Sequence, residues 1–236
     1  MTRPRIFAFA LLCSAALAGP ALAGELVVLD AKGVDLAAGQ TLDGKAPLKL
    51  PDGAKVTLVG ADGTTIKLKG PFDGAPEGDG AAGGNRVAES LQKMVSAREG
   101  DATALGAARA AGGPAELPEP WLVDATVEGN VCLKEGTAAV LWRPAADAAA
   151  ELALMPVDRS WTAKTPWPAG EARLALPEEV PFADGETFLT EISGTSAALT
   201  VHILPEALKT DAMRAAFLAT KGCDRQLAAL RRQTVR

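Results

Sequence analysis

Four kinds of side chain in this sequence are candidates for chemistry or binding: one histidine, two late cysteines, many acids, and tryptophans beside prolines. His202 is the only histidine and lies in the alternating run Val201-His202-Ile203-Leu204. Histidine is the commonest general base and metal ligand, but a lone histidine at a strand end is more often a hydrogen-bonded structural residue. The chain also has no Gly-x-Ser-x-Gly turn to present a nucleophile to it.

The acidic residues could in principle form a catalytic carboxyl pair or a calcium loop, but their positions favour neither. A glycosidase uses two carboxyl groups about 5 to 10 Å apart, and a calcium loop uses Asp-x-Asp-x-Asp-Gly spacing, which is absent. Most of the acids stand in Asp-Gly pairs, where hydrogen bonds to the turn backbone explain them. We therefore expect no catalytic residue, metal or cofactor, with an envelope enzyme using His202 or a carboxylate pair as an alternative.

Trp161 and Trp167 are the candidate ligand-binding residues. They lie in the segment Trp-Thr-Ala-Lys-Thr-Pro-Trp, which we expect to be a loop. Exposed aromatic faces hold sugars or proline-rich peptides, because they offer apolar area at little cost in entropy. A carbohydrate-binding module is therefore a second alternative. The simpler interpretation is that all four tryptophans fill cores in a chain with only 4% aromatic residues.

Cys132 and Cys223 are predicted to form a disulfide. They are the only cysteines after residue 23, and an even number of cysteines in an exported chain is typical of paired rather than free thiols. Two cysteines so far apart, with no neighbouring histidine, do not make a zinc site.

Residues 1–23 have the composition of a secretory signal peptide. Two arginines precede the apolar run Ile6–Ala18, and Ala21-Leu22-Ala23 is a small-x-small cleavage site. Cleavage is expected after Ala23, which gives a periplasmic or secreted protein. The apolar run is shorter than the roughly 20 residues of a membrane span, so we expect no span in the mature chain.

Asp-Gly pairs punctuate short alternating apolar runs between Thr41 and Gly74. Asp-Gly favours tight hairpin turns, and apolar residues at every second position indicate strands with one buried face. We predict a ladder of hairpins whose strands are Leu48–Leu50, Lys55–Val59 and Thr65–Lys69, preceded by a strand at Leu26–Leu29.

This ladder resembles the periplasmic FecR-like domain through Gly39–Leu42, Leu48–Leu58 and Asp62–Leu68. The resemblance covers about a fifth of the chain. It implies a periplasmic β module that senses or docks partners.

The rest of the chain is predicted to add a helical linker, a second β region and a helical tail. Segment 73–118 is rich in glycine and contains two predicted helices between residues 85 and 111. Seven short predicted strands within 119–204 suggest an immunoglobulin-like β-sandwich. Helices are expected in 205–236, beginning near Pro205, with Gly222 as a C-terminal cap. The predicted fold class is mainly β with α (α+β). After the signal peptide at 1–23, the predicted order is a FecR-like unit at 24–72, the helical linker at 73–118, the β-sandwich at 119–204 and the helical tail at 205–236.

The overall charge limits the class of partner. The formal net charge is −5, which argues against nucleic acid and anionic membranes, since both require a basic surface. The sequence therefore predicts an exported, non-catalytic binding or scaffold module for an envelope protein or cell-wall component.

Overall fold

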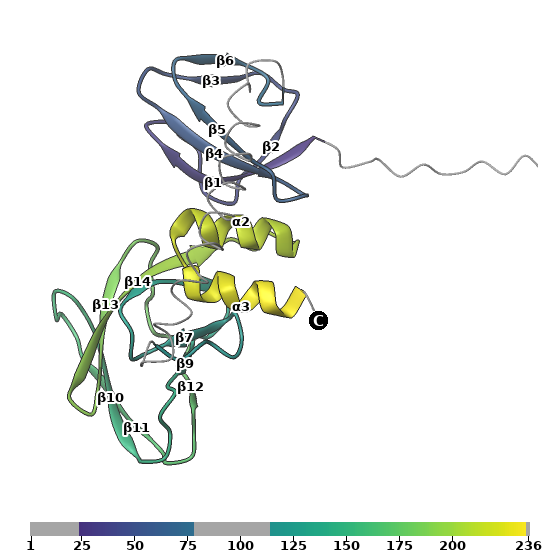
Figure 1. Cartoon of the computed structure of the whole chain (residues 1–236). Helices are drawn as coiled ribbons and strands as arrows, with labels where there is room; N and C mark the ends of the chain where they lie inside the picture. Colours follow the sequence, from purple (N-terminus) through teal and green to yellow (C-terminus); the bar gives the residue numbers. More distant parts are fainter. Residues whose placement is uncertain (1–23, 78–113, 235–236) are drawn as a thin grey trace, which may run out of the picture.

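The computed structural model describes residues 24–77 and 114–234, and these are mainly β with two helices near the C-terminus (Figure 1). The predicted signal peptide and the predicted helices between residues 85 and 111 lie outside the described residues. No helix within the described ranges is long and apolar enough to cross a membrane. The mainly β class with α elements is therefore confirmed.

The N-terminal β unit, residues 24–77, contains one sheet of four strands and a separate pair. The sheet has the order β2-β1-β4-β5 and consists of β1 (Glu25–Lys32), β2 (Thr41–Asp43), β4 (Lys55–Gly60) and β5 (Thr65–Lys69). The separate pair joins β3 (Leu48–Leu50) to β6 (Phe72–Gly74).

Only part of the predicted hairpin ladder is present. Strands β4 and β5 form a hairpin, but β1 lies between β2 and β4, and β3 pairs with the later β6. Leu26–Leu29 of β1 are all buried, because both faces of the strand are covered: Leu26 and Val28 pack in one cluster, and Val27 and Leu29 in another. The last strand of the unit, β6, ends at Gly74, two residues beyond the predicted limit of the unit at residue 72.

The turn between β4 and β5 has the predicted Asp-Gly chemistry. Asp62 accepts hydrogen bonds from the Thr64 amide at 2.9 Å and the Thr64 hydroxyl at 2.6 Å. These bonds, the hydroxyl bond first, lower the pKa of Asp62. Gly63 has a φ of 83°, and a Cβ there would lie 2.9 Å from Ala212 of the C-terminal tail. The glycine therefore serves both the turn and a close contact with the tail.

The C-terminal body contains two sheets that share one core. The larger sheet has the order β11-β10-β13-β14-β8 and the smaller one β12-β9-β7. Side chains from both sheets, including Trp167, Phe188 and Leu141, form a single buried cluster. The strands are β7 (Leu122–Asp124), β8 (Gly129–Lys134), β9 (Val140–Trp142), β10 (Ala150–Pro156), β11 (Ala163–Trp167), β12 (Arg173–Ala175), β13 (Thr187–Ile192) and β14 (Thr195–Leu204).

Strand β11 was not predicted, because its segment has the composition of a loop. It pairs with β10 at the edge of the larger sheet, with Pro166 opposite Glu151. A proline donates no ladder hydrogen bond, but an edge strand tolerates it because one side of its backbone needs no partner. The expectation of a loop is therefore wrong for Ala163–Trp167.

Two helices follow the body: α2 (Asp211–Lys221) and α3 (Asp224–Thr234). Helix α2 begins at Asp211 rather than near Pro205, because Thr210 is the N-cap and its hydroxyl accepts the Met213 amide hydrogen bond at 3.1 Å. Gly222 caps α2 with a φ of 72°, so the prediction of its C-terminal cap is confirmed.

The helices lie between the N-terminal β unit and the C-terminal body (Figure 1). Val27, Leu29 and Val59 of the N-terminal unit share a buried cluster with Phe217 and Leu218 of α2. Polar contacts border this cluster: Lys221 Nζ lies 3.1 Å from Asp30 Oδ1, and the Thr210 hydroxyl donates to the Ala61 carbonyl at 3.0 Å. The two β regions are thus joined through the C-terminal tail.

Candidate functional site

A hydrogen-bonded turn follows β10 and displays an apolar side chain. The Arg159 amide donates to the Pro156 carbonyl at 2.9 Å, and the Ser160 amide donates to Asp158 Oδ1 at 3.0 Å. Hydrogen bonds from the Ser160 amide and side chain lower the pKa of Asp158. Arg159 has a φ of 55°, which costs free energy for a residue other than glycine. The backbone of this turn is therefore strained but firmly held.

Beside this turn lies a groove of about 500 Å³, which we call the Trp161 groove. Its residues are Pro156, Val157, Asp158, Ser160, Trp161, Pro181, Ala183, Glu186, Thr187 and Phe188. Val157 is 57% exposed and is the only large apolar side chain classed as exposed in the described part of the chain.

Aromatic packing fixes the half-buried Trp161 at the groove. Its ring centroid lies 6.1 Å from that of Phe188, which Phe182 meets edge-on at 4.9 Å. Phe188 is 1% exposed and belongs to the core of the body. Trp161 is thus anchored on a rigid base, which lowers the entropy lost when a ligand covers it.

The rim of the groove is acidic. Asp158 and Glu186 line it, and both are exposed. The groove therefore combines proline, valine and aromatic side chains with polar groups and with negative charge at the edge. This combination suits an apolar segment that carries a basic residue.

Trp167 does not belong to this groove, which corrects its prediction as a ligand-binding residue. Its side chain is 0% exposed and lies in the core between the two sheets. Arg143 covers its ring at 5.0 Å from the centroid and donates to the Pro168 carbonyl at 2.8 Å. Because β11 alternates, Trp167 points inward, whereas Trp161 precedes the strand and stays at the surface.

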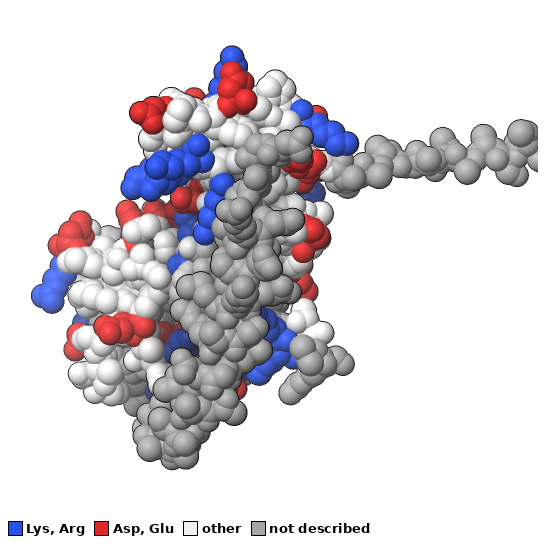
Figure 2. Space-filling model, turned by 45° about the horizontal axis from the view of Figure 1, so that its top comes forward, with Lys and Arg blue, Asp and Glu red and all other residues white. Residues whose placement is uncertain are grey.

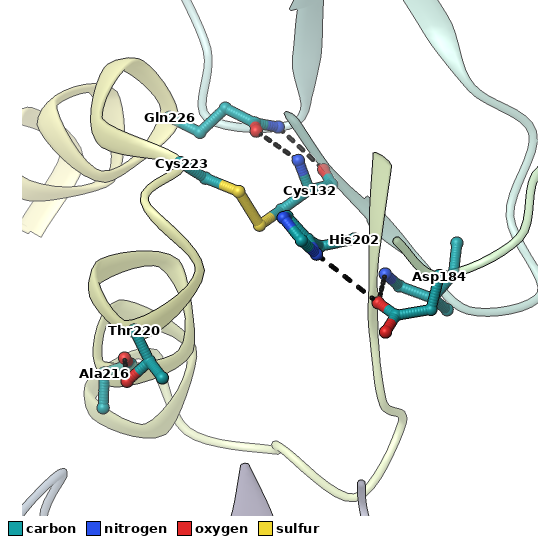
Figure 3. The surroundings of a disulfide bond; sticks show 8 residues. Cys132, Asp184, His202, Ala216, Thr220, Cys223 and Gln226 are labelled. Atoms are coloured by element: carbon teal, nitrogen blue, oxygen red, sulfur yellow. Dashed lines mark hydrogen bonds and ion pairs between the residues drawn. A yellow bond between two sulfur atoms is a disulfide. The ribbon is translucent and has the colours of Figure 1, made fainter. Parts of the chain in front are cut away.

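Cys132 and Cys223 form the predicted disulfide, with their Cα atoms 6.0 Å apart (Figure 3). Cys132 lies on β8 and Cys223 in the link between α2 and α3. The buried Gln226 amide bonds the Cys132 backbone on both sides: its Nε2 donates to the carbonyl at 2.8 Å and its Oε1 accepts from the amide at 2.6 Å. These contacts tie the helical tail to the body.

His202 lies beside the disulfide on β14, opposite Cys132 in the parallel pair (Figure 3). Its side chain is 15% exposed, and its Nδ1 lies 3.7 Å from Asp184 Oδ1. Burial, and then the charge of Lys221, lower the pKa of His202, while Asp184 and Asp30 oppose that shift. Within the described ranges, no hydroxyl or thiol is hydrogen-bonded to His202, and no group of three or more His, Cys, Asp or Glu residues is arranged to hold a metal ion.

Comparison of the chain with models of known protein families and with curated proteins finds no match.

Sequence reasoning found Trp161 but missed Val157 and Phe188. The available signal was the turn Pro156–Ser160, in which the apolar Val157 stands between a Pro and an Asp, two residues that favour turns. In the sequence, Phe188 is only one apolar residue of a predicted strand. Its position beneath Trp161 could not be predicted, because it depends on the pairing of β10 with β13.

Proposed function

We propose that this protein is an exported, non-catalytic binding or scaffold module, whose Trp161 groove takes an apolar segment of an envelope protein. The observation that carries this proposal is the exposure of Val157 on a strained, hydrogen-bonded turn beside an anchored tryptophan. Backbone strain clusters at functional sites, and exposed apolar side chains around an aromatic anchor are typical of binding surfaces.

The proposal includes a fold assignment for each β region. The N-terminal β unit is proposed to be FecR-like, on the residues that carry the resemblance. The C-terminal body is proposed to be immunoglobulin-like. Its order β11-β10-β13-β14 corresponds to C′-C-F-G of a variable-type sandwich, and β12-β9 corresponds to E-B in the opposite sheet. The parallel pairs of β14 with β8 and of β7 with β9 depart from the antiparallel scheme.

Photocrosslinking in living cells tests the groove directly. A benzoylphenylalanine at position 157 should crosslink to one discrete envelope protein, and the same group at the exposed, remote position 147 should not. Trp161→Ala should reduce the crosslink at least fivefold, because it removes the anchor of the groove. Equal crosslinking at both positions, or none at 157, would overturn the proposed role of the groove.

The same cells test export. The mature protein should be recovered from the envelope fraction with residue 24 at its N-terminus. Recovery of the protein in the cytosol with residues 1–23 still attached would contradict this part of the proposal.

The two alternative functions give different results. A carbohydrate-binding module now depends on Trp161 alone, and it predicts retention on cell-wall glycan that Trp161→Ala abolishes. An envelope enzyme would use His202 or a carboxylate pair. In the first case it predicts an activity that His202→Gln removes.

A further inference from the structure

Four lysines lie on one face of the sheet of the N-terminal β unit, and three of them are direct cross-strand neighbours. Lys32 of β1 is the direct partner of Lys55 of β4, and Lys55 is the direct partner of Lys69 of β5. Directly paired residues share one face of a sheet. Lys67 stands two residues before Lys69 and therefore lies on the same face. All four side chains are exposed, and we call them the lysine row.

The lysine row is unfavourable by itself. Like charges directly opposite each other destabilise a sheet, and none of the four lysines has a side-chain ion pair or hydrogen bond within the described ranges. Two other strand lysines form ion pairs with an acid on the neighbouring strand: Lys49 Nζ lies 3.4 Å from Asp73 Oδ2, and Lys164 Nζ lies 2.9 Å from Glu151 Oε1. Figure 2 shows Lys and Arg side chains at several places on the N-terminal β unit, with Asp and Glu side chains between them.

Protection of a sheet edge does not explain the whole row. Strand β5 is the outer strand in the order β2-β1-β4-β5, and lysines on an edge strand discourage unwanted strand pairing. That role accounts for Lys67 and Lys69. The pairing of β2 with β1 ends at Val27, so Lys32 also lies at an open stretch of strand. Edge protection does not account for Lys55, because β4 is paired there with β1 on one side and with β5 on the other.

We propose that the edge of β5 binds an extended acidic segment of a partner protein as an added antiparallel strand. The backbone of the segment pairs with β5, as in other cases of strand addition. Acidic side chains at alternate positions then face Lys67 and Lys69, with Cβ atoms about 5 Å apart. Lys55 and Lys32 extend the positive potential inward and favour the acidic segment over a neutral one.

The geometry favours a peptide over an anionic membrane. Lys55, Thr57 and Val59 alternate along β4 and share one face, and Val59 is covered by α2 on that face. Helix α2 therefore stands above the plane of the sheet on the face that carries the lysines, at the Val59 end of β4 (Figure 1). A flat bilayer meets the helix before it reaches the lysines, whereas an added strand lies in the plane of the sheet.

The β5 edge with the lysine row is a second binding surface, separate from the Trp161 groove. Its proposed acidic partner rests on the proposed binding role of the protein but not on the groove. The test is fluorescence anisotropy of the full chain with a labelled peptide of alternating glutamate and valine. Binding should weaken at least tenfold in the double variant Lys55→Gln, Lys69→Gln. The matched control Lys164→Gln, on the edge strand β11, should leave binding unchanged within twofold. Val157→Asp should also leave it unchanged, which separates this surface from the groove.

Two further probes make the outcome decisive. A peptide with N-methyl groups on alternate amides keeps its charge but cannot pair as a strand, so it should bind at least tenfold more weakly. Vesicles of phosphatidylcholine with 20% phosphatidylglycerol should not bind. No binding of the acidic peptide, equal binding of the N-methylated peptide, or lysine-dependent binding to vesicles would each overturn the proposal.

Discussion

The two β regions of this protein obtain their cores in different ways. In the C-terminal body the two sheets cover each other and bury Trp167 and Phe188 between them. The N-terminal β unit fills one side of its sheet with aliphatic residues, and its other side is covered by α2 through Phe217 and Leu218. The body thus holds its core internally, whereas the N-terminal unit depends on a tail that follows the body in sequence.

The tail is also attached differently to its two neighbours. A disulfide and the buried Gln226 amide join it to the body. Apolar packing, one partly exposed ion pair and one threonine hydrogen bond join it to the N-terminal β unit. A covalent bond holds independently of packing, so the joint to the N-terminal unit should be the weaker of the two.

Removal of the disulfide should give the largest effect. Cys132 and Cys223 are 91 residues apart, and closing a loop of that length lowers the entropy of the unfolded chain by an amount equivalent to about 4 to 5 kcal/mol. Cys132→Ala with Cys223→Ala should therefore lower the free energy of unfolding by about that much, measured by urea denaturation. Oxidised wild-type protein is the control, and an unchanged midpoint would show that the tail is held by packing alone.

Phe217→Ala should break the other joint. Phe217 is 0% exposed in the cluster shared with Val27 and Val59, and truncation of a buried phenylalanine costs about 3 to 5 kcal/mol. Amide hydrogen exchange should accelerate in β4 and stay unchanged in β13. Phe182→Ala, in the body, is the matched control and should give the reverse pattern. Equal acceleration in both strands would mean that the two regions unfold as one unit.

Gln226→Leu should loosen the tail from the body without touching the disulfide. The substitution leaves the amide and carbonyl of Cys132 without partners in a buried place, which costs about 2 kcal/mol. The exposed Gln233 of the same helix supplies the control, since Gln233→Leu should change thermal stability little. A similar loss in both variants would point to helix propensity rather than to the buried hydrogen bonds.

The smallest expected effect is a pH dependence at the junction near His202. Its pKa is lowered in the folded protein, mainly by burial, so between that pKa and the ordinary value of 6.5 the unfolded chain binds more protons. Stability should therefore be complete above pH 6.5 and decrease as the pH falls through this window. His202→Gln should flatten the dependence, as measured by urea denaturation between pH 5 and 7.5.

Asp184→Asn sharpens the same test. The Asp184 carboxylate raises the pKa of His202 against the effect of burial, so its removal should lower that pKa further and steepen the pH dependence. A profile that is identical in all three proteins would show that His202 does not titrate differently on folding.

Local patterns predicted most elements of this fold but not their pairing. Lys55–Val59 and Thr65–Lys69 alternate clearly and are followed by turn residues, so both strands and their hairpin could be predicted. The pairing of β3 with β6 could not, because it joins strands that are not neighbours in sequence. Strand β11 could not be predicted because it contains Pro166. A proline is tolerated in a strand at the edge of a sheet, and the sequence does not show which strand lies at the edge.

The candidate site was predictable only in part, for the same reason. Trp161 and Trp167 look equivalent in the sequence, but the pairing of β11 with β10 buries one and leaves the other at the surface. The disulfide was predictable because the predicted signal peptide leaves only two later cysteines, which restricts the choice to one pair. The lysine row was not, since Lys32, Lys55 and Lys69 become neighbours only through the register of β1, β4 and β5.

The cluster shared by β1 and α2 sets the order in which the chain completes its fold during synthesis. Lys221 and Asp30, which border the cluster, are 191 residues apart, and contacts of such long range form late. Until the ribosome has made α2, Val27, Leu29 and Val59 remain uncovered and form an adhesive apolar surface on nascent chains. Premature termination before residue 211 would leave that surface permanently exposed, and such fragments should be substrates for chaperones and quality-control proteases.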